Sequence, residues 1–136
     1  MNKIISTEKP EIHFQSDHLS MEYIPDSHYA IFTWKGHLDL IDYEKALEVM
    51  LDFVRRKRIS RCIADTTHLH TIPARAQKFI DTIFMPQIEI AGITKMSVIV
   101  SVTVYNSLII KKIMAGKSIE THYFDTLDEG KKWLLD

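Results

Sequence analysis

From residue 29 onward, short apolar segments alternate with amphipathic helical segments, and this order constrains the fold more than any other feature. Residues 62–64 are apolar without alternation and residues 95–100 are mostly apolar, which is typical of strands covered by helices on both faces. A segment with helical spacing of its apolar residues follows each of these strands. Short alternating units of this kind build a largely parallel sheet with covering helices.

Four segments are predicted to be helical. Asp39 stands at an N-cap position before the first, and Pro73 opens the second, which we expect to end at Pro86. The third covers about residues 104–115. The fourth follows a capping-box pattern that starts at Thr126.

Residues 11–35 precede the alternating region and show a different pattern. Apolar residues there alternate with polar ones, separated by turn-forming segments at 16–18 and 25–28, which predicts a meander of strands. The sequence therefore predicts an α/β fold with a mixed, largely parallel sheet of about five or six strands and about four helices. We expect one domain over residues 1–136, with residues 1–10 docked loosely.

Composition narrows the class of partner. Lys plus Arg (17) nearly balance Asp plus Glu (18), so the chain has no net electrostatic field that would attract nucleic acid. The content of 46% apolar and 26% charged residues is typical of a globular chain.

Cys62 is the single cysteine, which rules out an internal disulfide and favours a reducing compartment. The first ten residues lack the apolar core of a signal peptide, and the longest apolar run, 96–104, is too short to span a bilayer. We expect a cytoplasmic protein without membrane insertion.

Three local features resemble a known family. They are the strand Ile31-Phe32-Thr33-Trp34-Lys35-Gly36 running into a helix, Asp65 after the middle strand, and the closing segment from Tyr123-Phe124-Asp125-Thr126 to Trp133-Leu134. Together they resemble the STAS-like proteins related to bacterial anti-sigma-factor antagonists, a group described alongside the CRAL-TRIO lipid-binding fold. The resemblance covers about residues 11–135. It implies a mixed sheet with helices and a role in regulatory protein contacts or in holding small apolar or anionic ligands.

The family's regulatory loop is altered in this chain. True antagonists are phosphorylated on a serine in an Asp-Ser-x-Gly type loop, whereas this sequence reads Asp65-Thr66-Thr67-His68 with no nearby glycine. The resemblance leaves Thr66 and Thr67 as the candidate phosphoacceptors.

Ligands of open parallel sheets gather at the carboxyl ends of the strands, so we expect a ligand or partner loop there. The candidate residues are Trp34, Lys35, His37, Asp65, Thr66, Thr67 and His68. Packing at a strand end is the simpler interpretation of Trp34, and capping of the following loop is that of Asp65. His68 and His70, with His37, could supply metal ligands, but no carboxylate motif accompanies them, and we expect no metal and no cofactor.

Catalysis has weak support in the sequence. Cys62 lies within a strand, where burial keeps a thiol neutral, and the four glycines form neither a phosphate loop nor a nucleophile elbow. An acid–base pair of Asp65 and His68 stays open as a minor enzymatic alternative. We expect no enzyme.

The segment 104–115 is apolar nearly all round. A stripe of Tyr105, Leu108, Ile109, Lys112 and Ile113 can face the sheet, which leaves Ile110 and Met114 on a different side. Another helix covers these two residues, or they form a subunit interface or the wall of an apolar pocket.

The interpretation we favour is a non-catalytic, STAS-like regulatory module that acts through protein contacts, with itself as a homodimer or with another regulatory protein. The alternative is a carrier or sensor of a small apolar, lipid-like ligand bound between the third and second helices. The residues assigned to the interface or pocket are Phe79, Ile83, Phe84, Ile109, Ile110, Ile113 and Met114.

Overall fold

A computed structural model of the chain describes residues 9–136, and most of the N-terminal segment predicted to dock loosely lies outside the described residues. Six strands form one sheet in sequence order. They are β1 (Glu11–Gln15), β2 (Leu19–Ile24), β3 (Tyr29–Gly36), β4 (Arg61–Leu69), β5 (Lys95–Ile99) and β6 (Glu120–Phe124). The helices are α1 (Leu40–Lys57), α2 (Ala74–Phe79), the π-helical segment η1 (Ile80–Phe84), α3 (Met85–Ala91), α4 (Val104–Met114) and α5 (Leu127–Leu135).

The predicted fold class is confirmed. Strands β1, β2 and β3 pair antiparallel as a meander, and β3 to β6 pair parallel. Because α2, η1 and α3 follow one another without a break, the described residues contain four continuous helical segments. The change from antiparallel to parallel pairing falls at β3, where hairpin turns give way to helical crossovers.

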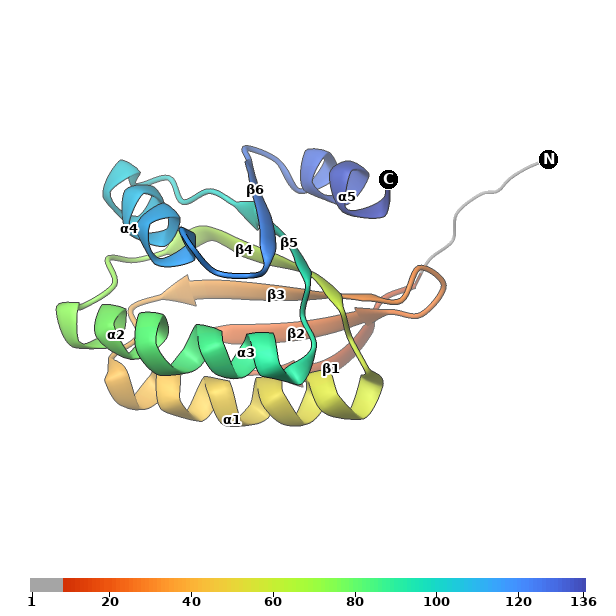
Figure 1. The fold of residues 1–136 in the computed structure, drawn as a ribbon, viewed down its shortest axis with the longest axis horizontal. Coiled ribbons are helices and arrows are strands. Elements are labelled where there is room, and N and C mark those ends of the chain that lie inside the picture. The colour runs from red at the N-terminus through yellow and green to blue at the C-terminus, as the bar shows by residue number, and fades with distance from the viewer. Residues whose placement is uncertain (1–8) are drawn as a thin grey trace.

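Helices cover the two faces of the sheet unequally (Figure 1). Apolar side chains of α1, α3 and α4 belong to one large core cluster with one face of the sheet, and α1 packs beside α2 and α3. The opposite face carries α5, which contacts β4, β5 and β6 around a smaller cluster that includes Ile63, Ile99 and Leu134. We call these the α1 face and the α5 face.

Helix α1 begins as the sequence predicts. The Asp39 carboxylate accepts a hydrogen bond from the Asp42 N–H at 3.1 Å, and the Asp42 carboxylate accepts one from the Asp39 N–H at 3.0 Å. These bonds satisfy two donors at the exposed helix start, and the bond from the Asp42 N–H to the Asp39 carboxylate holds the pKa of Asp39 below its usual value. The first turn of α1 is therefore well defined, and Tyr43 lies in it.

The second helix does not end at Pro86, as we expected from the sequence. Proline lacks an N–H and its ring clashes with the carbonyl four residues earlier, which excludes a regular α-turn there. The π-helical turn η1 accommodates the proline, because the Met85 N–H donates to the Ile80 carbonyl five residues back. The helix continues to Ala91.

The buried face of α4 differs from the predicted stripe. Asn106, Ile109, Ile113 and Met114 are buried, whereas Tyr105 and Leu108 are 57% and 61% exposed. The Asn106 side-chain amide donates to the Leu69 and His70 carbonyls and accepts from the Ile72 N–H. Because Asn106 makes these bonds only when it is buried, the face of α4 that contains Asn106 points toward the core. Met114 is therefore buried, in place of Tyr105 and Leu108.

None of the helices in residues 9–136 combines the length and the apolar character needed to cross a bilayer.

Candidate functional site: an apolar cavity on the α1 face

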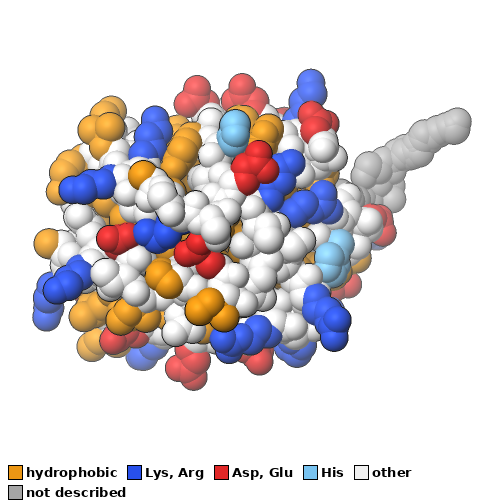
Figure 2. Space-filling view, in the orientation of Figure 1, with side chains coloured by type: hydrophobic (Ala, Val, Ile, Leu, Met, Phe, Trp, Pro, Cys, Tyr) orange, Lys and Arg blue, Asp and Glu red, His pale blue; other side chains and the backbone are white. Residues whose placement is uncertain are grey.

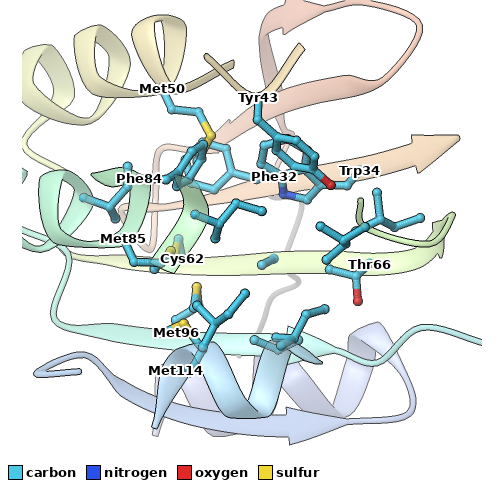
Figure 3. Close-up of a pocket in the computed structure, with 18 residues that line it drawn as sticks. Phe32, Trp34, Tyr43, Met50, Cys62, Thr66, Phe84, Met85, Met96 and Met114 are labelled. Atoms are coloured by element: carbon cyan, nitrogen blue, oxygen red, sulfur yellow. The ribbon is translucent and has the colours of Figure 1, made fainter. Parts of the chain in front are cut away.

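The α1 face contains a cavity of about 100 Å³ between the sheet and the helices (Figure 3). Its floor is formed by Phe32, Ala64 and Val98, which stand side by side in the register of β3, β4 and β5. Ala64 is the smallest of the three and lies on the middle strand. Its methyl group leaves more space above the sheet than the side chains of Phe32 and Val98 on either side.

The walls of the cavity are apolar and soft. Met50 comes from α1, Met85 from α3, Met96 from β5 and Met114 from α4. Methionine side chains are flexible and polarisable, so they adapt to occupants of different shape. Within the described residues, no charged side chain lines the cavity.

One polar group at the cavity has no partner. The Tyr43 hydroxyl is the single buried side-chain nitrogen or oxygen within residues 9–136 that lacks a hydrogen bond, and the residue is 3% exposed. Its ring centroid lies 5.8 Å from that of Trp34. Burial raises the pKa of Tyr43 far above its usual range, so its hydroxyl stays protonated and able to donate.

Cys62 also lines the cavity, and burial raises the pKa of its thiol to about 12. The thiol is therefore neutral at physiological pH and serves as an apolar wall. This agrees with the expectation that burial in the strand keeps the thiol neutral.

The strand-end residues are not gathered in one loop. Strand β4 continues to Leu69, so Asp65, Thr66, Thr67 and His68 lie within the strand and not after it, and Trp34 and Lys35 lie within β3. Of the seven candidates, His37 alone lies in a connection between elements. The placement of the ligand loop after Asp65 is therefore wrong.

Two of these candidates, Trp34 and Thr66, face the cavity. The Thr66 hydroxyl donates to the Ile99 carbonyl at 2.6 Å, and the residue is 5% exposed. A protein kinase needs an accessible hydroxyl, so this burial counts against Thr66 as a phosphoacceptor. Thr67 stays a prediction, with its hydroxyl donating to the Asp65 carboxylate at 2.6 Å.

The structure does not bring Asp65 and His68 together as an acid–base pair. The Asp65 carboxylate accepts from the Thr67 N–H and hydroxyl, and no hydrogen bond joins it to His68 in the described residues. The same part of the chain contains no group of three or more His, Cys, Asp or Glu side chains placed to hold a metal ion. The geometry offers neither alternative a site.

The interface or pocket residues divide into two groups. Phe84, Ile110, Ile113 and Met114 line the cavity. Ile109 is buried in the core, Phe79 packs at its edge, and Ile83 is 46% exposed on the surface. The sequence pattern missed Tyr43, which reads as one more apolar position of α1, although a buried tyrosine needs a partner for its hydroxyl.

Comparison with known proteins identifies the class by its fold. No family model matches the chain, and a comparison with curated proteins gives no match. The chain has a SpoIIAA-like, that is STAS-like, fold, which confirms the resemblance seen in the sequence.

That fold is shared with an uncharacterized protein from the DUF3478 family of Shewanella loihica PV-4, whose crystal structure is described as having a SpoIIAA-like fold. The two superpose with a TM-score of 0.63 over 96% of this chain and 98% of the other, at 16% sequence identity. At this identity the likeness establishes the fold.

Proposed function

We propose that the protein is a STAS-like binding module that holds a small apolar ligand in the cavity on the α1 face. The observation that carries this proposal is the cavity itself, about 100 Å³ of space lined by apolar side chains and by the unpartnered Tyr43 hydroxyl. Protein interiors are otherwise close-packed, and apolar space of this kind favours apolar molecules over water.

The cavity also fits the alternative function expected from the sequence, with two changes. The occupant lies between the sheet and the helices instead of between α4 and the second helix alone, and its volume is far below that of a lipid acyl chain with its headgroup. A small molecule, not a lipid, is the ligand we propose.

The test is a variant that fills the cavity from its floor. Ala64→Leu places three more carbon atoms into the space, and Ala74→Leu adds the same side chain at an exposed position of α2 as a matched control. Toluene should raise the melting temperature of the wild type and of Ala74→Leu, and should leave that of Ala64→Leu unchanged. If toluene and other small apolar compounds leave the wild type unchanged, the proposed function is wrong.

Protein contact is the second candidate function, and a different surface supports it from the one expected. Ile109, Ile113 and Met114 are buried, so the apolar side chains of this segment offer little surface to a partner. Large apolar side chains instead gather on the outside of α4 and the loop before it (Figure 2). We call this the α4 patch, and its members are Val102, Val104, Tyr105 and Leu108.

A second copy of the chain is the occupant we propose for the α4 patch. The chain carries a net charge of only −1, so two copies do not repel strongly, and a two-fold axis at α4 would bring the same apolar side chains together. Leu108→Asp should convert a dimer to a monomer in analytical ultracentrifugation, whereas Ile90→Asp, at an exposed position on α3, should not. A wild type that is monomeric at high concentration would exclude this candidate.

A further inference from the structure

The Tyr43 hydroxyl at one end of the cavity defines the chemistry of the ligand more closely than the cavity volume does. The Tyr43 hydroxyl is buried without a partner, an arrangement that costs free energy because the group has lost its water. A ligand atom that accepts a hydrogen bond from the Tyr43 hydroxyl would recover this free energy. The cavity therefore has one position at which a hydrogen-bond acceptor is favoured.

Figure 3 shows how polar and soft groups are distributed around the space. The hydroxyl of Tyr43 lies toward the end where Trp34 and Thr66 are drawn, and the sulfur atoms of Met96 and Met114 lie toward the opposite end. The Tyr43 hydroxyl and these sulfur atoms therefore mark opposite ends of the cavity.

Thr66 does not compete with Tyr43 for the ligand. Its hydroxyl proton is donated to the Ile99 carbonyl at 2.6 Å, so it has no proton left to offer. Tyr43 is the cavity-lining residue within residues 9–136 whose buried hydroxyl has no partner. A ligand can accept a hydrogen bond from this hydroxyl.

Charge and size exclude several classes of ligand. Because no charged side chain lines the cavity in the described residues, a carboxylate or phosphate inside it would be buried without a counter-ion, at a large cost. The space of about 100 Å³ is somewhat smaller than the engineered apolar cavity that takes up benzene, roughly 150 Å³. The adaptable methionines allow a molecule of about the size of one aromatic ring.

We infer that the ligand is a small, uncharged molecule with an apolar body of about one ring and a single oxygen, and that Tyr43 donates a hydrogen bond to this oxygen. Phenols, short alcohols and small ketones belong to this class, whereas fatty acids and phosphorylated compounds do not. The inference rests on the proposed function, since it assigns the chemistry of the ligand bound in the same cavity.

The experiment compares phenol with toluene, two molecules of nearly equal shape that differ in a hydroxyl and a methyl group. Dissociation constants for both are measured by isothermal titration calorimetry on the wild type, on Tyr43→Phe and on Tyr123→Phe. The last variant removes the same atom from a half-buried tyrosine of β6 that does not line the cavity, and it is the matched control. Benzoate, as the charged analogue, is titrated alongside.

Tyr43→Phe should weaken phenol binding about tenfold and change toluene binding less than twofold, because one hydrogen bond is lost. Tyr123→Phe should change neither, and benzoate should not bind. If both ligands bind the wild type but Tyr43→Phe leaves their ratio unchanged, or if benzoate binds as well as phenol, the inference is wrong and the proposed function stands. If neither phenol nor toluene binds the wild type, both are wrong.

A second measurement uses the wild type alone and does not depend on how the variant folds. With tyrosine labelled at the ring carbon that carries the hydroxyl, phenol should shift the Tyr43 carbon signal by NMR, and toluene should shift it much less. Equal shifts with both compounds would contradict the hydrogen bond.

Discussion

On the α5 face, Gly130 has no room for one more carbon atom, whereas on the α1 face Ala64 lies beneath an unfilled space of about 100 Å³. A Cβ at Gly130 would stand 2.7 Å from the Cδ1 of Ile99 and 3.3 Å from the Cβ of Ser97. The Ser97 hydroxyl donates to the Gly130 carbonyl at 2.7 Å, which fixes α5 at this short distance.

The two faces share the same central strand, and neighbouring residues on it have opposite surroundings. Ile63 is fully buried against the α5 side, and Ala64, the next residue, faces the cavity. Loose packing throughout the domain therefore does not explain the void. At roughly 24 cal/mol per Å³, an empty cavity of this size costs about 2 kcal/mol of stability, which a bound ligand would offset.

Adding bulk at Gly130 should give the largest effect. Gly130→Val places a branched side chain against Ile99 and Ser97, and overpacking of this kind costs about 1 to 3 kcal/mol, which outweighs the slightly better helix propensity of valine over glycine. We expect urea denaturation to show a loss of about 2 to 3 kcal/mol. Lys132→Val, at an exposed position of the same helix, should lose less than about 1 kcal/mol.

Adding bulk at Ala64, on the α1 face, should instead increase the free energy of unfolding. Ala64→Leu buries three more carbon atoms, each worth about 0.8 kcal/mol, less the lost side-chain entropy and some strain. We expect the ligand-free protein to gain about 1 kcal/mol in the same urea experiment. A loss as large as that of Gly130→Val would mean that the two faces are packed alike.

Much of this architecture could be predicted from periodicity. Alternating residues in the meander and the helical spacing in α1 depend on local geometry, which the order of residues records directly. The end of β4 could not be predicted in this way, since Asp65, Thr66 and Thr67 resemble a loop by composition. They extend as a strand because backbone pairing with β3 continues beyond Asp65.

The cavity depends on distant residues and was harder to predict. Its floor combines Phe32, Ala64 and Val98, which become neighbours only through strand register. The buried face of α4 likewise depends on Asn106 bonding to the end of β4, more than thirty residues away in the sequence. An alanine in the middle of an apolar strand, together with a tyrosine on the apolar face of α1, was the available signal.

Removing the Tyr43 hydroxyl should have a smaller effect on stability than either change in bulk. In the ligand-free protein the hydroxyl is buried and unbonded, so Tyr43→Phe removes an unfavourable group, and we expect a gain of roughly 0.5 to 1 kcal/mol. Urea denaturation in ligand-free buffer measures this gain. A clear loss of stability would show that the hydroxyl has a partner within the protein.

Titration of Cys62 should give the smallest effect and probes the α1 face chemically. Burial raises the pKa of the thiol from 9.0 to about 12, so the folded state retains its proton at a pH where the unfolded chain releases it. The contribution of this group is therefore fully present below pH 9 and is lost as the pH rises toward about 12. At pH 9 the loss amounts to roughly a few tenths of a kcal/mol.

Cys62→Ala should show a shallower decline than the wild type between pH 8 and pH 10, measured as the change in free energy of unfolding in urea. Equal slopes would mean that the Cys62 thiol reaches solvent through the cavity.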